Sequence, residues 1–560
     1  MSPTEPIDTP LVVQADLSVL LEVASPAFDE VRSALGRFAE LEKSPEHVHT
    51  YRITPLSLWN AAVAGLSSGD VASTLTRYAR YPVAPSVLAE VHDQMGRYGR
   101  LRLIRDHDTT GLALTSSEPA LIEEVARDKE VAKLLGERLD GNRFAVRTGD
   151  RGVLKQALLR LGWPASDEAG YDEGAELAGV EMTAELRSYQ ADAVAAWWHD
   201  GSEAGGNGVL ALPCGAGKTI IGLASMATAA CHTLIVVTSV SSAHQWRREL
   251  LDKTSLTDDQ IGEYSGQRKD IRPVTIATYQ VLTWAKRGVP KDADIFERHP
   301  NLELFDAQNW GLVVYDEVHL LPAPVFRATA RIQAIRRLGL TATLVREDGN
   351  EGDVFSLIGP KRFDAPWKEL EALGWVAPAT CTEVRVSLTD EQRMSYAVAE
   401  PEERHRIAAT TPSKLVALDA LLARHEGDRV LIIGQFLDQL ERVAERIGAP
   451  IVTGKTPQKA RDLLFEQFRS GEIDTLVVSK VANFSIDLPE ANVAIQLSGQ
   501  FGSRQEEAQR LGRIMRPKAD GGTASFYTVV AAETVEQTFA LNRQRFLAEQ
   551  GYSYQIVDVA

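Results

Sequence analysis

One stretch constrains the fold of this chain more than any other, because an apolar run in it breaks at a proline and two glycines and then resumes. The stretch covers residues 209–222 and reads Val-Leu-Ala-Leu-Pro-Cys-Gly-Ala-Gly-Lys-Thr-Ile-Ile-Gly. This pattern is typical of a phosphate-binding loop between a strand and a helix. Backbone N–H groups of the loop Gly215-Ala216-Gly217 can face one anion, and the start of the next helix adds about half a positive elementary charge.

Two side chains in the first turn of that expected helix can complete a nucleotide site. Lys218 can reach the β- and γ-phosphates, and the Thr219 hydroxyl can ligate Mg²⁺. The strict pattern also requires a glycine at the position where this chain has Leu212. A glycine-rich turn before a buried helix is therefore the alternative interpretation of this stretch.

Apolar strand-like runs alternate with helical stretches through two long parts of the chain. The first part has such runs at 233–238, 274–277, 312–315 and 337–340, and the second has them at 429–433, 450–452, 475–478, 493–496 and 524–530. Alternation of this kind predicts parallel sheets that are covered by helices on both faces. Because 560 residues exceed what one hydrophobic core usually serves, we expect an α/β protein of several domains.

The pattern divides the chain into six segments. Apolar residues at helical spacing between residues 17 and 41 predict a helical start, and a stretch rich in glycine and acidic residues predicts a linker before the phosphate loop. The segments are 1–47 (acidic and helical), 48–170 (mixed accessory domain), 171–182 (linker), 183–368 (first α/β domain), 369–548 (second α/β domain) and 549–560 (C-terminal tail).

Composition and charge exclude several classes of protein. Hydrophobic residues make up 44% of the chain and charged residues 24%, which is the balance of a globular protein. Without a signal peptide or an apolar run that could span a bilayer, we expect a cytoplasmic protein with no membrane partner. The few, scattered cysteines (Cys214, Cys231 and Cys381) argue against a disulfide framework or a zinc site. A net charge of -17 argues against nucleic-acid binding through bulk charge, so such binding would need local basic clusters.

An acidic pair, Asp316 and Glu317, directly follows the strand-like run at 312–315. Ligands of parallel α/β sheets bind beyond the carboxyl ends of the strands, so we expect this pair beside the phosphate loop. Asp316 would belong to the Mg²⁺ shell, and Glu317 would orient the attacking water or accept its proton. The pair and the loop together predict ATP hydrolysis.

A basic helical stretch in the second α/β domain predicts a contribution to the same reaction. The spacing of Gln509, Arg513 and Arg516 puts these three side chains on one helix face. A guanidinium can pair with phosphate oxygens through two parallel hydrogen bonds, so Arg513 and Arg516 are candidate arginine fingers. ATP would then draw the two α/β domains together, and its hydrolysis would release them.

Taken in order, these motifs resemble those of superfamily 2 helicases, and the likeness is strongest to the XPB-type DNA-repair helicases. Residues 338–348, 357–361 and 487–493 support that choice, and Arg346-Glu347-Asp348 resembles the R-E-D element of the family. The resemblance spans residues 48–545 and implies two RecA-like parallel-sheet motor domains in tandem after a small mixed α/β accessory domain. The motifs are Arg187-Ser188-Tyr189-Gln190, Gly215-Ala216-Gly217-Lys218-Thr219, Asp316-Glu317-Val318-His319, Thr341-Ala342-Thr343 and Gln509-Arg510-Leu511-Gly512-Arg513-Ile514-Met515-Arg516.

The resemblance also implies roles for single residues. Arg187 and Gln190 would contact adenine, and Gln509 would join the nucleotide site. Gln245 and Trp246 fall in a stretch that lines the nucleic-acid track of such motors, although a tryptophan in this setting is more often a core residue. Coupling of the ATP site to DNA is implied for His319, Thr341, Thr343, Arg346, Glu347, Asp348, Ser239, Thr278 and Asp487.

Two stretches complicate this comparison. Ala482-Asn483-Phe484 replaces the Gly-Asp-Thr that long eukaryotic members have before the serine of motif V, here Ser485. Residues 391–413 correspond to a thumb-like insertion that grips DNA in the family, and they contain Arg393, Arg404, His405 and Arg406. Glutamates interrupt this basic set, so a solvated helix face is the alternative interpretation of the insertion.

The residues and the resemblance together predict a DNA-stimulated, Mg²⁺-dependent ATPase. By resemblance it is a 3′–5′ DNA helicase or translocase of nucleotide-excision-type repair, in a prokaryotic, free-standing form. Its partners would be single-stranded and forked duplex DNA and a repair nuclease, and it would be associated with the nucleoid when it is on DNA; a monomer is favoured. The alternatives are an ATP-gated clamp or translocase on duplex DNA that recruits a nuclease, and an RNA helicase. Against the latter stand Asp316-Glu317-Val318-His319 in place of D-E-A-D and the R-E-D triplet.

Overall fold

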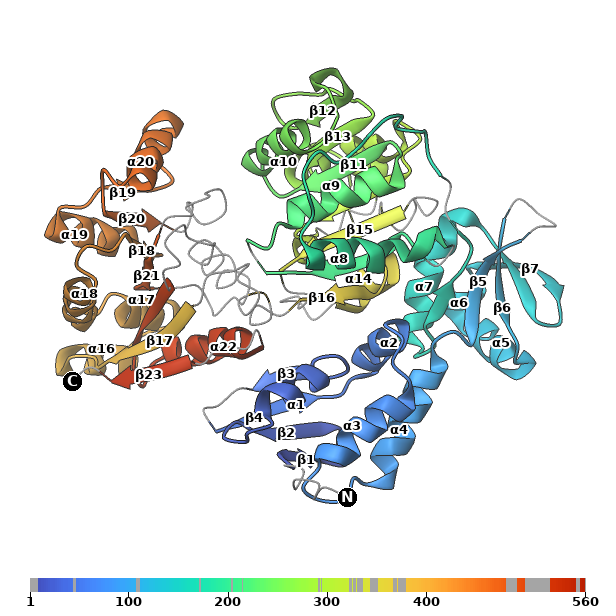
Figure 1. Cartoon of the computed structure of the whole chain (residues 1–560), viewed down its shortest axis with the longest axis horizontal. Coiled ribbons are helices and arrows are strands. Elements are labelled where there is room, and N and C mark those ends of the chain that lie inside the picture. The colour runs from blue at the N-terminus through green and yellow to red at the C-terminus, as the bar shows by residue number, and fades with distance from the viewer. Residues whose placement is uncertain are drawn as a thin grey trace. The chain divides into compact units, whose positions relative to one another are not determined.

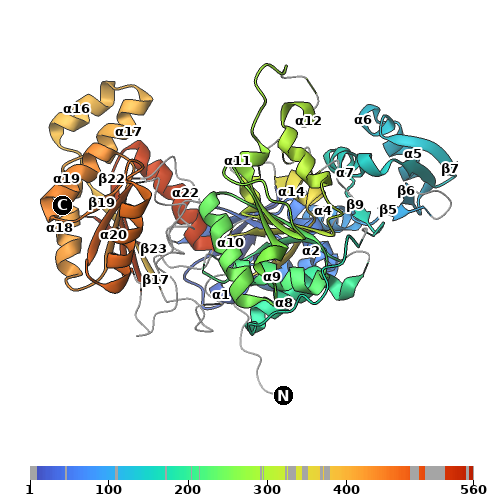
Figure 2. The same cartoon turned by 90° about the horizontal axis from the view of Figure 1, so that it is seen from above.

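A computed structural model provides the fold, and its described residues form two compact units. One unit contains chiefly the described residues up to Asp364, and the other chiefly those from Ala365 on. Figures 1 and 2 show the elements of both units. The described residues are 9–43, 47–106, 111–170, 173–202, 205–213, 215–290, 293, 295–321, 325, 329, 336–342, 351–365, 370, 379–479, 491–498, 524–549 and 554–558.

The first described elements form a small sheet with helices. The strand order is β1-β2-β4-β3, and β1 pairs antiparallel with β2. The prediction of a helical segment between residues 17 and 41 is wrong, because only α1 is helical there, between two strands. One reason is Pro26, which cannot continue a helix. The other is that residues of β2 pair with β1, and such pairing between segments cannot be read from helical spacing within one segment. The elements are β1 (Leu11–Val13), β2 (Ser18–Glu22), α1 (Phe28–Leu35), β3 (Glu40–Lys43), β4 (Val48–Arg52), α2 (Pro55–Val63), α3 (Ser68–Tyr78) and α4 (Pro85–Arg97).

A second small sheet follows, with strand order β7-β8-β6-β5-β9. Its elements are β5 (Leu101–Arg105), β6 (Leu112–Ser116), α5 (Pro119–Ala126), α6 (Lys129–Ala132), β7 (Leu135–Asp140), β8 (Arg143–Val146), α7 (Arg151–Arg160) and β9 (Ala165–Asp167). A buried ion cluster joins α7 to β9, since Arg151 Nε donates to Asp167 Oδ2 at 2.8 Å and Lys155 Nζ donates at 3.0 Å. Burial alone would raise the pKa of Asp167, but the two cations hold it well below its usual value.

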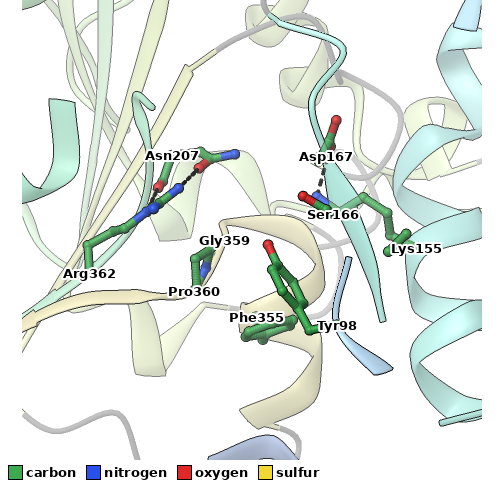
Figure 3. A pocket seen from close by; sticks show the side chains of 10 residues that line it. Tyr98, Lys155, Ser166, Asp167, Asn207, Phe355, Gly359, Pro360 and Arg362 are labelled. Atoms are coloured by element: carbon green, nitrogen blue, oxygen red, sulfur yellow. Dashed lines mark hydrogen bonds and ion pairs between the residues drawn. The ribbon is translucent and has the colours of Figure 1, made fainter. Parts of the chain in front are cut away.

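Side-chain contacts connect this part of the chain to the first α/β domain, which the resemblance implies is the first motor domain (Figure 3). Tyr98, which follows α4, packs edge to face against Phe355 of α14 (Glu351–Leu357) at 6.5 Å between ring centroids. Gln156 of α7 donates to Asp353 of α14 at 3.1 Å, and nearby Arg362 donates to Asn207 Oδ1 at 3.1 Å within the α/β domain itself. The accessory module is therefore packed against α14, which follows the R-E-D triplet in the chain.

The described strands of the first motor domain form a seven-stranded parallel sheet in the order β12-β13-β11-β14-β15-β10-β16. Four of these strands match predicted runs: β11 (Thr233–Val237), β13 (Val274–Thr278), β14 (Leu312–Asp316) and β15 (Arg336–Thr341). A fifth, β10 (Asn207–Ala211), overlaps the apolar run predicted as the strand before the phosphate loop, and the others are β12 (Ile261–Tyr264) and β16 (Lys361–Asp364). The described helices include α8 (Ser188–Trp198), α9 (Lys218–Ala229), α10 (Val240–Lys253), α11 (Tyr279–Leu282) and α12 (Ile295–Arg298).

The second motor domain repeats this design. Its described strands form a parallel sheet in the order β19-β20-β18-β21-β22-β17-β23. The fold class predicted from the sequence is thus confirmed. The predicted tail, however, contains β23, which pairs with β17 and could not be recognised as a strand from five residues alone. The elements are β17 (Ala379–Val386), α16 (Asp390–Val398), α17 (Pro401–Ala409), α18 (Ser413–Arg424), β18 (Val430–Gly434), α19 (Leu437–Ile447), β19 (Ile451–Val452), α20 (Gln458–Ser470), β20 (Thr475–Ser479), β21 (Val493–Gln496), β22 (Ala524–Ala531), α22 (Val535–Glu549) and β23 (Tyr554–Asp558).

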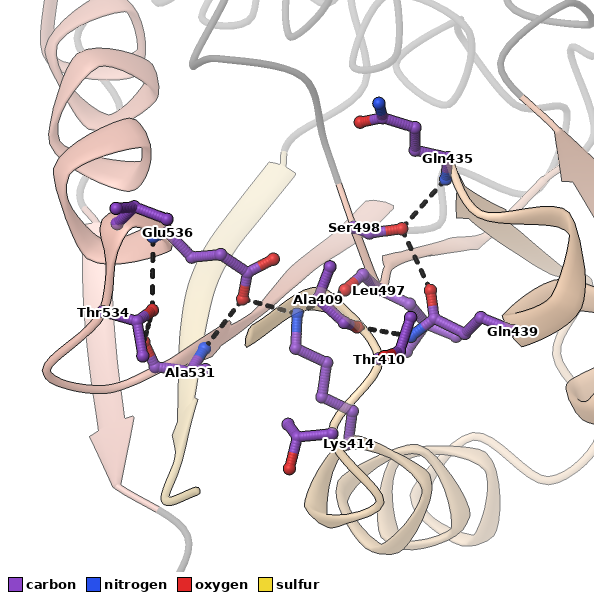
Figure 4. Close-up of polar contacts among 12 residues, drawn as sticks. Ala409, Thr410, Lys414, Gln435, Gln439, Leu497, Ser498, Ala531, Thr534 and Glu536 are labelled. Atoms are coloured by element: carbon purple, nitrogen blue, oxygen red, sulfur yellow. Dashed lines mark hydrogen bonds and ion pairs between the residues drawn. The ribbon is translucent and has the colours of Figure 1, made fainter. Parts of the chain in front are cut away.

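A buried polar network holds the carboxyl ends of β21 and β22 in the second motor domain (Figure 4). Lys414 Nζ donates to Leu497 O at 2.6 Å and to Glu536 Oε2 at 2.7 Å. The same Glu536 oxygen accepts the backbone N–H of Ala531 at 3.0 Å. A charge pair buried in this way stabilises the fold only because each ion is also hydrogen-bonded, so the network fixes where both strands end. No helix among the described residues is long and apolar enough to cross a membrane.

Candidate nucleotide and DNA site

Strand order brings three predicted motifs of the first motor domain together. β15 pairs in parallel with both β10 and β14, so the carboxyl ends of these three strands are neighbours. β10 leads into the phosphate loop, β14 ends at Asp316, and β15 ends at Thr341. The candidate nucleotide site therefore lies at the carboxyl edge of the sheet, as expected for a parallel α/β fold.

The phosphate loop has the backbone that its sequence predicts. Gly215 and Gly217 have φ values of 86° and 77°, in the left-handed region that favours glycine, and α9 begins at Lys218. A Cβ atom on Gly217 would lie 2.5 Å from Gln190 Nε2. Leu212 does not have a positive φ, so the position where the strict pattern has a glycine needs none here.

Lys218 lies between the loop and the acidic pair. Its Nζ donates to the carbonyl oxygen of Leu212 at 3.4 Å and lies 3.7 Å from Glu317 Oε1. Only a tenth of the Lys218 side chain is exposed. The ammonium group therefore lies next to the phosphate loop. Phosphate oxygens of a nucleotide could replace Leu212 O and Glu317 Oε1 as its partners there.

Gln190 lies against the phosphate loop from the side of α8. Its side chain is buried, and its Oε1 accepts the backbone N–H of Arg187 at 3.0 Å. The Arg187 guanidinium lies 3.3 Å from the Tyr189 hydroxyl. The structure therefore brings the two candidate adenine contacts to the start of α8, next to Gly217.

Asp316 is half-buried at the end of β14. Burial, together with the negative charge of Glu317, raises the pKa of this carboxyl to about 6, although a hydrogen bond from Trp246 and the charge of Lys218 lower it. A carboxylate that is partly removed from water in this way is costly to keep charged without a cation, and a divalent ion would offset that cost. Asp316 and the half-buried Thr219 are thus an oxygen ligand set that fits Mg²⁺.

Glu317 has an unusual backbone conformation for a residue with a side chain. Its φ is 51°, in the left-handed region, which costs about 1–3 kcal/mol for a residue other than glycine. Its Oε2 accepts no hydrogen bond among the described residues and lies 3.5 Å from His319 Nδ1. The strained backbone thus presents a carboxylate oxygen that can still accept a proton or a hydrogen bond.

A short hydrogen bond links the acidic motif to the next strand. His319 Nδ1 and the Thr341 hydroxyl lie 2.6 Å apart, and both residues are buried. The contact connects the residues after β14 to the end of β15. The remaining predicted coupling residues on this side, Thr343 and Arg346-Glu347-Asp348, lie outside the described residues.

Ser239 and Thr278, two predicted DNA-coupling residues, are N-caps of helices in this structure. Ser239 Oγ accepts the backbone N–H of Ser242 at 3.1 Å, and Thr278 Oγ1 accepts that of Val281 at 3.4 Å. Thr278 is only 1% exposed. These hydroxyls therefore fix the starts of α10 and α11 at the carboxyl edge of the sheet.

Two aromatic residues support the acidic motif, and sequence reasoning missed this role. Trp246 is buried, which confirms its interpretation as a core residue, and Tyr279 donates through its hydroxyl to the carbonyl oxygen of Asp316 at 3.0 Å. Gln245, beside Trp246, is half-buried. The only sequence signal for either contact is that each of the two helices contains an aromatic residue, Trp246 in α10 and Tyr279 in α11.

The structure tests little of the candidate site in the second motor domain. Gln509, Arg513, Arg516 and Asp487 lie outside the described residues, as does the altered motif V. In the thumb-like stretch, His405 is buried between the rings of Phe436 and Phe539, with centroids at 5.5 and 5.4 Å. A DNA contact through this histidine would require it to leave that packing. Arg393 is exposed, and Arg406 pairs with Asp438 at 3.1 Å.

Comparison with known families finds helicase models along the chain. Residues 370–560 match the model described as ERCC3/RAD25/XPB C-terminal helicase. Residues 183–346 match the model of the type III restriction enzyme res subunit, and residues 11–140 match a model of a helicase conserved C-terminal domain. The part that matches the first of these models contains every described strand of the second parallel sheet, and the part that matches the second model contains those of the first sheet except β16.

Comparison with curated proteins finds relatives that align over nearly the whole chain. A protein of Kineococcus radiotolerans named DNA 3'-5' helicase XPB is 58% identical over 98% of this chain and 97% of its own length. A protein of the same name from Mycobacterium tuberculosis is 56% identical over 98% of both chains. The XPB helicase/translocase subunit of general transcription and DNA repair factor IIH from Antonospora locustae is 32% identical over 99% of this chain and 82% of that protein.

Proposed function

The chain belongs to the XPB family of DNA helicases, and from this premise we propose that it uses ATP and Mg²⁺ to move 3′ to 5′ on DNA during nucleotide-excision-type repair. As a member of that family it is a DNA helicase with ATPase activity.

One observation supports the ATP site most strongly. Lys218 Nζ, the phosphate-loop cation, lies 3.7 Å from a carboxylate oxygen of Glu317, which directly follows the half-buried Asp316. A cation for phosphates, a carboxylate for a metal and a second carboxylate for water are the parts that phosphoryl transfer to water requires. Neighbouring carboxyl ends of parallel strands gather all three.

The proposed reaction assigns each group one task. Backbone N–H groups of Gly215, Ala216 and Gly217 and the ammonium of Lys218 bind the phosphates. Glu317 orients the attacking water and accepts its proton. Thr219 and Asp316 would hold Mg²⁺, which supplies positive charge beside the phosphates when it is bound. Arg187, Gln190 and Gln509 would contact the nucleotide, and Arg513 and Arg516 would neutralise the charge that develops on the transferred phosphoryl group.

We propose that the ATP site is coupled to DNA through residues that begin at the same carboxyl edge of the sheet. The contact between His319 and Thr341 would transmit the state of Glu317 to the end of β15 and from there to Thr343 and Arg346-Glu347-Asp348. Ser239 and Thr278 would act by fixing helix starts beside the track, and Asp487 would act from the second motor domain. The replacement Ala482-Asn483-Phe484 in motif V makes this last contact the one that differs most from the family pattern.

The proposal includes a cellular setting. A repair helicase works on the chromosome, so we place the protein in the cytoplasm and on the nucleoid when it is bound to DNA. Single-stranded and forked duplex DNA would be its substrates, and a repair nuclease would be its protein partner. We propose that it acts as a monomer.

A test of polarity and substrate uses duplexes that differ only in their single-stranded tail. We expect unwinding of a 3′-tailed DNA duplex, no unwinding of the 5′-tailed one, and no unwinding of the matching RNA duplex. Preference for the RNA duplex would favour an RNA helicase. ATP hydrolysis without strand separation, together with nuclease recruitment that survives Arg346→Ala, would favour the clamp or translocase and contradict the helicase assignment.

A further inference from the structure

An exposed loop of the first motor domain combines a tryptophan with cations. The loop covers residues 283–290, after α11, and we refer to it as the Trp284 loop. Trp284 is 54% exposed, and Lys286 and Arg287 beside it are also exposed. Single exposed apolar residues are common and need no explanation, but an exposed indole flanked by two cations combines the two chemistries that bind single-stranded nucleic acid.

The base of the Trp284 loop is held by hydrogen bonds. The backbone N–H of Lys286 donates to Arg298 O at 2.9 Å, and the carbonyl oxygen of Thr283 lies 2.9 Å from His299 Nδ1. The backbone N–H of Trp284 also donates to Val281 O at 3.4 Å. An anchored loop presents its indole at a low cost in conformational entropy, which favours binding.

A second basic turn shares an anchor with this loop. Arg268 and Lys269 are exposed in the turn after β12, which pairs with β13. Asn301 accepts a hydrogen bond from Lys269 Nζ at 2.8 Å and donates one to the carbonyl oxygen of Val281 at 2.8 Å. The cations of the two turns therefore belong to one surface, which follows the carboxyl ends of β12 and β13.

The position of this surface in the sheet favours DNA as its partner. β12 and β13 lie at one end of the strand order, and β10, which leads into the phosphate loop, lies toward the other. The hydroxyls of Ser239 and Thr278, the predicted track residues between them, already cap helices. Because these two hydroxyls are already used within the protein, the exposed side chains that follow β12 and β13 are better placed to contact DNA on this side of the ATP site.

We propose that the Trp284 indole stacks on a base of single-stranded DNA while Lys286 and Arg287 contact the flanking phosphates. The proposal deepens the proposed function, since it rests on DNA lying along this edge of the sheet. It assigns a base contact, whereas charge alone would give binding to the backbone. Stacking on one aromatic side chain is sequence-tolerant, as a helicase that moves along any sequence requires.

The test compares full-length variants for binding of a labelled oligothymidine and of an abasic strand of the same length, without ATP, by fluorescence anisotropy. We expect Trp284→Ala to weaken binding of the oligothymidine by about tenfold and to leave binding of the abasic strand unchanged. Trp284→Phe should restore most of the lost affinity. Leu251→Ala, which removes an exposed apolar side chain from α10 of the same domain, is the matched control and should change neither affinity.

The double variant Lys286→Ala, Arg287→Ala should weaken binding of both strands and reduce the salt slope by about 0.7 for each lost phosphate contact. Equal losses on both strands for Trp284→Ala, or no loss on either, would overturn the proposal; no loss on either would point to a protein partner for this surface. Because the assay contains no ATP, it gives the same answer whether or not Lys218 and Glu317 have their proposed roles.

Discussion

The indole N–H of Trp246 donates a hydrogen bond to Asp316 Oδ2 at 2.9 Å, although the two residues lie 70 positions apart in the chain. The ring of Trp246 is also close to α9, because a Cβ atom on Gly222 would lie 2.4 Å from it. One tryptophan of α10 thus holds the candidate metal ligand and packs on the helix that begins with Lys218. A residue outside both the phosphate loop and the acidic pair therefore helps to position the Asp316 carboxylate.

Trp246→Phe should keep the packing and remove the hydrogen bond to Asp316. We expect the Mg²⁺ concentration for half-maximal ATP hydrolysis to rise by about tenfold, because groups that orient a metal ligand typically affect metal affinity by 10–100-fold. The measurement is a Mg²⁺ titration of the hydrolysis rate at saturating ATP. The matched control is Trp197→Phe, since the Trp197 indole is equally buried and donates to Arg337 O at 3.1 Å, away from the acidic pair. A similar rise in both variants would contradict the role of Trp246.

Gly217→Ala should damage the phosphate loop in two ways. The new side chain would favour leaving the left-handed conformation at φ 77°, and its Cβ would clash with Gln190 Nε2. We expect nucleotide affinity to fall by about 10-fold or more, measured by equilibrium binding of a fluorescent ATP analogue. Gly266→Ala is the control, because it has open space around its Cβ and no positive φ. Wild-type affinity in Gly217→Ala would show that the loop does not hold the nucleotide.

His319 and Thr341 should act as one unit. A double-mutant cycle with His319→Ala and Thr341→Val compares the ratio of DNA-stimulated to DNA-free ATP hydrolysis in the four proteins. Because the two side chains share a hydrogen bond, we expect each single variant to lower the ratio and the double variant to lower it no further, with a coupling energy of about 0.5–3 kcal/mol. Strictly additive effects would mean that the contact does not transmit the state of the ATP site.

Low pH should lower the stability of the accessory module, because Asp167 becomes protonated. Its pKa in the folded protein lies below that of the unfolded chain, about 3.9, so its contribution to stability is present above pH 4 and is lost as the pH falls toward the folded value. Asp167→Asn should lower the unfolding free energy at pH 7 by about 3–5 kcal/mol, because Arg151 remains buried without its counter-ion. Below pH 4 the difference from wild type should shrink.

The measurement for Asp167→Asn is the urea midpoint of the first unfolding transition between pH 3 and 8. Asp93→Asn breaks the exposed pair with Arg97 and should change the midpoint little at any pH. An Asp167→Asn profile that runs parallel to that of the wild type across this range would contradict the assignment of a buried, ionised Asp167.

The sequence predicted the parts of this protein that depend on local pattern. The runs at β11, β13, β14 and β15 are short, apolar and rich in β-branched residues, so their strand character could be read directly. Residues 17–41 could not, because pairing of β2 with β1 overrides their helical spacing. The phosphate loop and the acidic pair follow from sequence motifs, whereas the hydrogen bonds of Trp246 and Tyr279 to Asp316, and the left-handed backbone of Glu317, depend on packing between distant segments.

ATP hydrolysis with and without single-stranded DNA, measured for the wild type and Glu317→Gln while unwinding of a 3′-tailed duplex is followed, tests the account most directly. We predict strong stimulation by DNA and unwinding in the wild type. In Glu317→Gln we predict a loss of hydrolysis of about 100-fold or more, with ATP binding retained, since the amide cannot accept the proton of the attacking water. Hydrolysis at the wild-type rate in Glu317→Gln, or a wild type that hydrolyses no ATP with DNA present, would contradict it.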